Sequence, residues 1–398
     1  MAKVEQLPID SDTLDLIVQR GDWSPTLVAR MEFSSAAQIL QQHVAALVRC
    51  SECGLTPWEA EAPKYRHIRC TPCTPVTRVW PNMSNPQTSG RMSVSGPPLG
   101  NFTADQRYGP HGIRDAVCPD SGHVWICMDW SAVEARKIAH YDRDPVDNEA
   151  FARGYDIHTV TAREMFGWPA FTFEPTKAGL KSPAGLEWCA EIGWLIHRGQ
   201  CRLTQHVGCD MIPWSGTHRY RTIVKATRYT LQYAVNEKAL ARYVIEMRMP
   251  REELFTFGVM YLRSKPWLVA WKNQTWASVS RSLIARTWAG RARKFPQWRS
   301  VAAKIKTEKE GLNHIIQGGV ADMMKMTLAA VWRMFREQGV PGRLVYQSHD
   351  GAKWQVPVGN VGVLSRIQEI VEREWVIDGR AIRYPGEFEI VYAPGEGE

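Results

Sequence analysis

The sequence predicts an α+β fold that combines a small antiparallel sheet with a larger helical part. The residues Val124–Met128 form a short apolar run typical of a buried strand. An Asp-Gly pair at Asp350–Gly351 separates two strand-like runs, which is the pattern of a β-hairpin. Between these strands lie long stretches with helical periodicity, and the stretch 218–245 contains neither glycine nor proline.

The composition is that of a globular protein with room for two or three subdomains. The chain has 398 residues, 44% of them hydrophobic and 23% charged, and a formal net charge of +8. This positive charge permits a polyanionic partner such as nucleic acid. There is no signal-peptide pattern and no run of about 18 apolar residues, so we expect a cytoplasmic protein (the host cytoplasm for a viral or plasmid gene) with no membrane partner.

Four cysteines in the N-terminal part of the chain have the spacing of a zinc ribbon. Cys50 and Cys53 form one Cys-x-x-Cys pair, and Cys70 and Cys73 form a second. Two tight turns can bring four thiolates together around one tetrahedral Zn²⁺, which would be structural. Ordinary buried thiols are the alternative, since nine cysteines without a secretion signal argue against disulfides.

The segment 81–103 is rich in proline, glycine, serine and asparagine, so we predict a loop. Its Arg91 and Asn101 offer groups that suit a phosphate backbone. A surface linker would have the same composition.

Asp129 ends the first predicted strand, just before a helix that begins near Ala132. A carboxylate at this junction is held rigidly at the edge of a sheet, as a metal-bound catalytic acid requires. The alternative is a helix start in which Ser131 and Glu134 form a capping box and Asp129 is a solvated acid. Asp350 has a similar alternative as a turn residue.

Residues 168–218 are predicted to be irregular and follow a helix that reaches Gly167. Their cysteines and histidines allow a second zinc site, with scattered buried thiols and surface imidazoles as the alternative. The candidate ligands are Cys189, His197, Cys201, His206 and Cys209.

The predicted helix 218–245 carries Arg221, Lys225, Tyr229 and Tyr233 at intervals of four residues, so all four share one face. Two cations followed by two aromatic rings can hold a triphosphate and pack against its sugar and base. A solvated helix face is the alternative.

The rest of the chain is predicted to be mostly helical before the sheet is completed. We expect helix over 255–294, closing with a basic run from 281 to 294, and helices over 301–335 broken at Gly311 and Gly318. The hairpin around Asp350 follows, then a helix over 363–375 and a last strand over 388–392.

Taken together, these features resemble DNA polymerase family A from about Ser89 to the C-terminus. The matching motifs, in order, are Met128–His140, Gly154–Gly167, Arg221-x3-Lys225-x3-Tyr229-x3-Tyr233, Arg286–Arg293, Asn313-x3-Gln317-Gly and His349-Asp350.

The resemblance implies a right-hand polymerase architecture. The antiparallel palm sheet would come from the Asp129 strand, the Asp350 hairpin and the terminal strand. Residues 1–80 would form a reduced thumb with the zinc knuckle, 81–165 and 301–398 the two parts of the palm, and 166–300 the fingers with an insertion at 168–218. The N-terminal part is too short for an exonuclease domain of about 170–200 residues, so we expect no intrinsic proofreading.

The resemblance also implies the chemistry: primer-dependent, template-directed DNA synthesis from dNTPs. Asp129, Asp350 and the backbone carbonyl of Trp130 would hold two Mg²⁺ ions. The implied partners are primer-template DNA and dNTPs, with a separate exonuclease or helicase as a further candidate, and the enzyme would act as a monomer.

Site residues follow from the matched motifs. Arg221 and Lys225 would hold the triphosphate, with Lys225 protonating the leaving pyrophosphate, and Tyr229 would pack on the sugar. The other nucleotide contacts would be Tyr233, Glu134 and His158, and the primer-template contacts would be Arg91, Asn101, Gln317 and His349.

Glu134 favours deoxynucleotides, because single-subunit RNA polymerases lack this acid, and Tyr229 predicts efficient termination by dideoxynucleotides. Two positions depart from the family pattern: Gly351 stands where a third acid is usual, and Ala234 replaces a glycine. An RNA polymerase, or a degenerate fold that only binds DNA, remains the alternative.

Overall fold

The computed structural model describes residues 118–197, 219–234, 237–243, 250–348 and 350–393, together with Arg91, Trp214 and the paired strands β1 (Asn82–Ser84) and β2 (Ser93–Ser95). These residues belong to two compact units. The first unit contains 134–286 and 291–316, and the second contains the two short strands, 118–133, 287–290 and 317–393.

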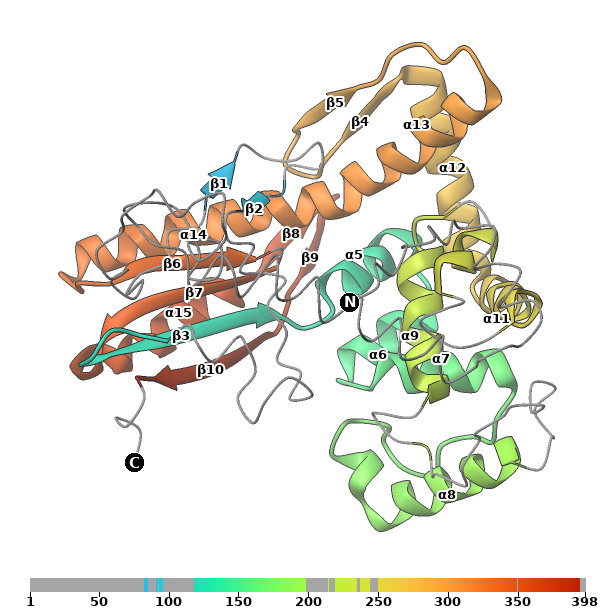
Figure 1. Cartoon of the computed structure of the whole chain (residues 1–398), viewed down its shortest axis with the longest axis horizontal. Helices are drawn as coiled ribbons and strands as arrows, with labels where there is room; N and C mark the ends of the chain where they lie inside the picture. Colours follow the sequence, from blue (N-terminus) through green and yellow to red (C-terminus); the bar gives the residue numbers. More distant parts are fainter. Residues whose placement is uncertain are drawn as a thin grey trace, which may run out of the picture. The chain divides into compact units, whose positions relative to one another are not determined.

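The second unit is built on a four-stranded antiparallel sheet. Its strands are β3 (His123–Trp130), β6 (Arg343–Ser348), β7 (Gly351–Pro357) and β10 (Gly386–Tyr392), in the order β10-β3-β7-β6 (Figure 1). This order confirms the predicted combination of the Asp129 strand, the Asp350 hairpin and the terminal strand. Strand β3 is central and mostly buried, which explains why it reads as a continuous apolar run.

Helix α14 (Gly319–Glu337) packs against strand β6 and helix α15 (Leu364–Val371). Its first six residues are all buried, and from Met324 onward buried side chains recur every three or four residues, so one stripe of the helix faces the core. Between β7 and α15 lies the 3₁₀-helix η9 (Val358–Val363).

The predicted helix over 363–375 is too long, because α15 ends at Val371 and the chain then turns into a hairpin of strands β8 (Trp375–Ile377) and β9 (Arg380–Ile382). Asp378 and Gly379 join these strands with φ values of 49° and 73°, the backbone of a type I′ turn.

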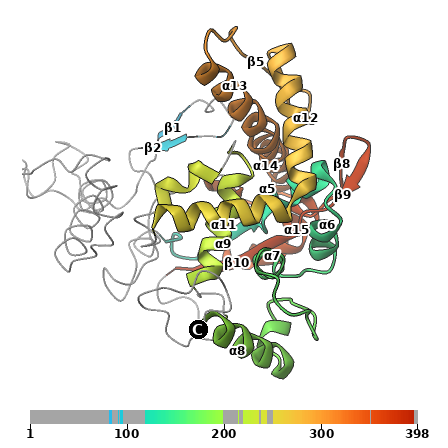
Figure 2. The same cartoon turned by 90° about the vertical axis from the view of Figure 1, so that its right-hand side faces the viewer.

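The first unit is mainly helical. Among the residues that the structure describes, no helix of either unit is both long enough and apolar enough to cross a membrane. The elements are α5 (Val133–Asp142, whose first residue falls in the second unit), α6 (Pro145–Ala152), α7 (Ile157–Phe166), η6 (Gly179–Lys181), α8 (Pro183–His197), α9 (Arg219–Leu231), η7 (Glu237–Tyr243), α11 (Arg251–Ser264), α12 (Pro266–Ser282), β4 (Ile284–Arg286), β5 (Ala292–Lys294) and α13 (Val301–Asn313) (Figures 1 and 2).

Local sequence signals set the ends of the helices near the site. Asp144 caps α6 by accepting from the backbone N–H groups of Val146 and Asp147, and proline at the first position fixes the helical φ. Asp156 caps α7 by accepting from the Thr159 N–H. Gly167 ends α7 in the left-handed conformation, with a φ of 62°.

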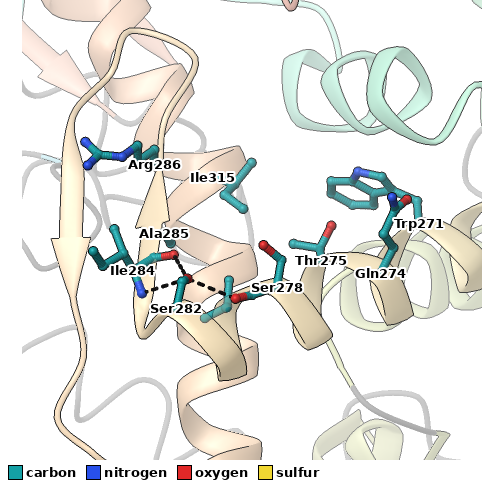
Figure 3. A pocket seen from close by; sticks show the side chains of 10 residues that line it. Trp271, Gln274, Thr275, Ser278, Ser282, Ile284, Ala285, Arg286 and Ile315 are labelled. Carbon is teal, nitrogen blue, oxygen red and sulfur yellow. Dashed lines mark hydrogen bonds between the residues drawn. The ribbon is translucent and has the colours of Figure 1, made fainter.

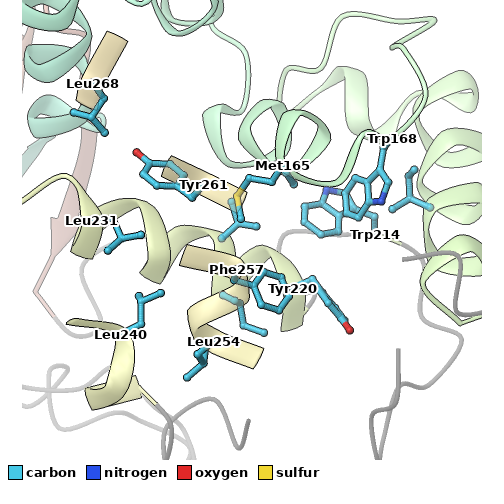
Figure 4. Packing of buried hydrophobic residues seen from close by; sticks show 14 of the residues in the cluster. Met165, Trp168, Trp214, Tyr220, Leu231, Leu240, Leu254, Phe257, Tyr261 and Leu268 are labelled. Carbon is cyan, nitrogen blue, oxygen red and sulfur yellow. The ribbon is translucent and has the colours of Figure 1, made fainter. Parts of the chain in front are cut away.

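Aromatic side chains form much of the core of the first unit (Figure 4). The ring centroids of Trp168 and Trp214 are 5.0 Å apart, and Trp168 also meets Trp188 edge-on at 6.2 Å. Phe257 packs against Tyr220 at 5.7 Å. Several of the 17 tryptophans therefore serve packing rather than a binding surface.

Three predictions for this unit were wrong in part. Residues 168–218 are not irregular throughout, because they contain α8 and η6. Helix α9 ends at Leu231 rather than near residue 245. The basic run 281–294 is not helical, because Leu283 ends α12 in the left-handed conformation and the β4–β5 hairpin follows.

Helix α13 continues through Gly311, where the sequence suggested a break. A Cβ at this position would lie 2.6 Å from Cγ1 of Val279, so glycine permits the close approach of α12 and α13. The regular α-helix is interrupted later, by a π-helical turn at His314–Gly318.

Candidate functional site

The sheet of the second unit brings Asp129 and Asp350 onto neighbouring strand ends. Asp129 is directly opposite Gly351 in the β3–β7 pairing. The backbone N–H of Trp130 donates to the Asp350 carbonyl oxygen at 3.2 Å, so the residue after one acid is tied to the other. Two acids 221 positions apart in the sequence therefore meet at one end of the sheet, as predicted.

Negative charges converge on Asp129. Although its side chain is exposed, partial desolvation and then the charges of Asp350 and Glu387 raise the pKa of Asp129 to about 7. Glu387 lies directly opposite Asp129 in the β3–β10 pairing, so both side chains share one face of the sheet.

Gly351 leaves the space beside Asp129 open. A Cβ at position 351 would lie 2.9 Å from Oδ1 of Asp129 and 2.9 Å from the carbonyl oxygen of Met128. A side chain there would require the Asp129 carboxylate to move.

The acid pair fits a magnesium site. Mg²⁺ prefers oxygen ligands and is bound by one or two carboxylates, with water and substrate phosphates completing its shell. A divalent cation would also relieve the repulsion that raises the pKa of Asp129. Over the described ranges, no set of three or more His, Cys, Asp or Glu side chains is arranged to hold a metal by itself.

Most of the predicted zinc ligands lie outside the described residues. This applies to Cys50, Cys53, Cys70 and Cys73 of the first site and to Cys201, His206 and Cys209 of the second. Cys189 is described and is buried in the aromatic core of the first unit, while for His197 only the backbone is described.

Helix α9 of the first unit has one accessible face and one buried face. Lys225 is exposed, and Arg221, Tyr229 and Tyr233 are half-buried. Tyr233 lies two residues beyond the helix, where backbone hydrogen bonds to Thr230 and Arg228 continue the helical path. The four residues predicted to bind nucleotide are therefore accessible.

Arg221 is fixed by Asp156. Its Nη2 lies 2.5 Å from Oδ1 and its Nε 3.1 Å from Oδ2, a two-point contact that orients the guanidinium. Burial would raise the pKa of Asp156, but the hydrogen bond and charge of Arg221 outweigh burial and hold this pKa below its usual range.

His158 is buried between charged groups and next to Tyr229, with ring centroids 5.8 Å apart. Burial lowers the pKa of His158 to about 3, and the cations Arg228, Arg221 and Lys225 lower it further against the attraction of Asp156. The imidazole of His158 is therefore neutral at pH 7. The cations around it would attract a negatively charged ligand.

The Tyr233 hydroxyl donates a hydrogen bond to Oε2 of Glu134, a residue in the first turn of α5. The two residues predicted to lie beside the sugar of the nucleotide are thus in direct contact.

A buried ion cluster anchors α9 from behind. Arg228 donates to Oδ2 of Asp147 at 2.5 Å, and Lys265 lies 2.7 Å from Asp147 and 2.5 Å from Glu164. Arg228 and Lys265 are each 1% exposed. Opposite charges compensate the burial of each member, so the cluster holds α6, α7, α9 and the start of α12 in one arrangement.

The four predicted primer-template contacts are only partly described. Arg91 is half-buried, and Gln317 is half-buried in the π-helical turn. Asn101 and His349 lie outside the described residues.

A hollow of about 570 Å³ lies beside α12 and strand β4 (Figure 3). Trp271 and Arg286 contribute to its wall together with the hydroxyl groups of Thr275 and Ser278. Tyr141 stacks on Trp271 with ring centroids 5.5 Å apart, so one face of this indole is already covered.

Three residues with structural roles near the site, Asp156, Glu387 and Lys272, are not among the site residues predicted from the sequence. Asp156 lies inside the Gly154–Gly167 motif, and Glu387 directly precedes the last strand predicted over 388–392. Lys272 shares the buried side of α12 with Leu268 and Val279. A lysine in register with apolar residues is the signal that could have revealed it.

Comparison with known proteins identifies what this arrangement is similar to. The family model described as DNA polymerase family A matches residues 71–177 and 206–378. The interruption falls inside the predicted insertion 168–218. Curated relatives include DNA polymerase I, thermostable, of Thermus caldophilus (25% identity over 290 residues, 72% of this chain and 29% of that protein) and DNA polymerase I of Chloroflexus aurantiacus (26% over 328 residues, 79% and 30%).

A solved structure shares the fold. It is the POL domain of Pol1 from M. smegmatis in complex with DNA primer-template and dNTP, with a TM-score of 0.67 and 20% identity, covering 96% of this chain and 56% of that chain. The chain spans about three tenths of the length of the curated relatives that it matches.

Proposed function

Because the chain belongs to DNA polymerase family A, we propose that it catalyses template-directed, primer-dependent DNA synthesis from dNTPs. The observation that carries this proposal is that Asp129, on strand β3, lies opposite Gly351, while the turn residue Asp350 is tied to Trp130 by a backbone hydrogen bond. A protein that only binds DNA has no need of two acids that repel each other.

Asp129 and Asp350, with the backbone carbonyl of Trp130, would hold two Mg²⁺ ions. When bound, Mg²⁺ would supply activation of the primer 3′-hydroxyl and neutralisation of charge on the phosphates. We further propose the division into palm, fingers and reduced thumb at the boundaries predicted above, with zinc held by the four N-terminal cysteines.

Helix α9 would bind the nucleotide. Arg221, oriented by Asp156, would grip the triphosphate in two-point fashion, and Lys225 would add a second cation and donate a proton to the leaving pyrophosphate. Tyr229 would pack against the sugar, and His158, neutral at pH 7, would donate a hydrogen bond to a phosphate oxygen. The primer-template would contact Arg91, Asn101, Gln317 and His349.

The contact between Tyr233 and Glu134 favours DNA over RNA synthesis. A Glu134 side chain held in this position occupies the space that a ribose 2′-hydroxyl would need. We therefore propose dNTPs as the substrates.

Primer extension tests the proposed function. Wild type, Asp129→Asn and Asp350→Asn would be supplied with a labelled primer-template, Mg²⁺ and either dNTPs or ribonucleotides. We expect extension with dNTPs, lowered by about a thousandfold in each variant, since metal ions contribute several kcal/mol to such transition states.

Three other outcomes would contradict the proposal. Binding of DNA without extension would indicate an accessory protein, and efficient extension with ribonucleotides alone would indicate an RNA polymerase. Full activity of Asp129→Asn would show that the acid pair is not the metal site.

A further inference from the structure

Lys272 is a buried lysine in the middle of α12. Its side chain is 2% exposed, and its Nζ donates to the carbonyl oxygens of Leu231 and Ala234, each at 2.6 Å. The ring of Trp276 lies with its centroid 5.0 Å from the same nitrogen. Lys272 is therefore directed at the end of helix α9.

One of the two carbonyl groups that Lys272 binds, that of Leu231, belongs to the last residue of α9, and that of Ala234 lies three residues beyond the helix. The last carbonyls of an α-helix have no partner within the helix, and together they carry a partial negative charge. A cation supplied by a neighbouring helix satisfies them and caps the end of α9.

Tyr233 lies between these two anchor points. Leu231 precedes it by two residues and Ala234 follows it directly, so both bonds restrain the same turn of backbone. At the other end of the residue, the Tyr233 hydroxyl is held by its hydrogen bond to Glu134. The ring is thus held from the backbone side by Lys272 and from the hydroxyl side by Glu134.

A lysine is an unfavourable choice if the position only fills space. Burial lowers the pKa of Lys272 to about 7, which reflects the free-energy cost of keeping an ammonium out of water. Leucine or methionine would pack beside Leu268 and Val279 without this cost. The amine keeps two N–H donors after it loses a proton, so both bonds can be made in either charge state.

We propose that Lys272 is a positioning residue, which holds Tyr233 against Glu134 and thereby sets the selectivity for deoxyribose over ribose in the incoming nucleotide. This inference rests on the proposed function, because the position of Tyr233 affects selectivity only if nucleotides bind beside it. Lys272 would not touch the substrate.

The test compares Lys272→Met, which removes the donors, with Lys272→Arg, which keeps donors and charge. Asn273→Met is the matched control, because Asn273 is the exposed neighbour on the same helix. Glu134→Ala, which acts on the sugar directly, is the positive control. For each protein, kcat/KM is measured in primer extension with dNTPs and with ribonucleotides.

The ratio of the two kcat/KM values does not depend on the fraction of active protein, so simple destabilisation leaves it unchanged. We expect Lys272→Met to lower the deoxyribose-to-ribose ratio by about tenfold, within the range that a small steric change in a pocket produces. In Lys272→Arg the ratio should stay within about threefold of the wild-type value, and in Asn273→Met it should be unchanged. An equal loss with both nucleotides, with the ratio intact, would overturn the proposal.

Hydrogen–deuterium exchange provides a readout that needs no catalysis. The amides of Gln232, Tyr233 and Ala234 are hydrogen-bonded within the turn that Lys272 anchors. Lys272→Met should exchange them at least about tenfold faster than wild type, and Asn273→Met should not.

Unchanged exchange in Lys272→Met would overturn the positioning role whether or not the protein is a polymerase. Absence of extension by the wild type would instead overturn the proposed function. If Lys272→Met does not fold, Lys272→Gln, whose amide is one atom shorter and reaches the carbonyls poorly, must show the same two effects in weaker form.

Discussion

Arg221 and Asp156 form a two-point salt bridge between the first turn of α9 and the N-cap of α7. The same carboxylate accepts a hydrogen bond from the Thr159 N–H at 3.0 Å. One acid therefore starts a helix and orients the cation proposed to grip the triphosphate.

Asp156→Asn should raise the KM for dNTPs by about tenfold with little change in kcat. The amide can still cap α7, but a charge-assisted contact that orients Arg221 is lost, which is worth about 1.4 kcal/mol. Steady-state kinetics of primer extension measure the change. Glu149→Gln, which removes an exposed acid paired with Arg153, is the control and should have no effect. A lower KM in Asp156→Asn would show that Asp156 competes with the triphosphate instead.

Metal binding should depend on pH near neutrality. The pKa of Asp129 is about 7 without metal, so the carboxylate is mostly protonated at pH 6 and mostly ionised at pH 8. Because a metal needs the ionised form, Mn²⁺ affinity measured by calorimetry should be about tenfold lower at pH 6 than at pH 8.

Glu387→Gln should move this pH midpoint downward. Removing the negative charge opposite Asp129 lowers the pKa of that carboxyl, so metal binds at lower pH. The same titration in Asp129→Asn is the control. A midpoint that stays unchanged in Glu387→Gln would show that Glu387 does not influence the acid pair.

Lys265→Met should destabilise the first unit by about 3–5 kcal/mol, because it leaves the buried acids Asp147 and Glu164 with too little positive charge. Urea unfolding measures the loss. The matched control is Lys304→Met at the more exposed pair with Glu308, where we expect less than about 1 kcal/mol. A cost as small as that of the control would mean that the acids take up protons instead.

Tyr229→Phe should make the enzyme discriminate against dideoxynucleotides by about tenfold or more, because the hydroxyl beside the sugar is lost. Competition between dideoxynucleotides and dNTPs in primer extension measures this ratio. Tyr220→Phe, the same change at a buried position of the same helix, should leave it unaltered. Strong discrimination by the wild type would show that Tyr229 does not lie beside the sugar.

The sheet could be predicted because its signals are local. The run Val124–Met128 is apolar since β3 is central in its sheet, and Asp350–Gly351 sits where the chain reverses. The second Asp-Gly pair, Asp378–Gly379, is the same kind of turn signal, but it closely follows a stretch with helical periodicity that hides the hairpin.

The wrong boundaries arise where tertiary contacts override local preference. Nothing in the sequence of residues 219–245 forbids a longer helix, yet α9 ends at Leu231, and Lys272 donates to the carbonyl oxygen of this last residue. Lys272 is 41 positions away from Leu231 in the sequence, so no sequence pattern alone could show that it binds the end of α9. The same applies to Asp156, whose partner Arg221 is 65 positions distant.

The close approach of Gly311 to Val279 also makes the effect of a substitution at one position depend on the residue at the other. Alanine at 311 would place its Cβ 2.6 Å from Cγ1 of Val279, whereas alanine at both positions would remove the two closest atoms and leave the two Cβ atoms 3.3 Å apart. Replacement of this glycine by alanine should therefore disturb the helix pair less when position 279 already carries a smaller residue than when it carries valine.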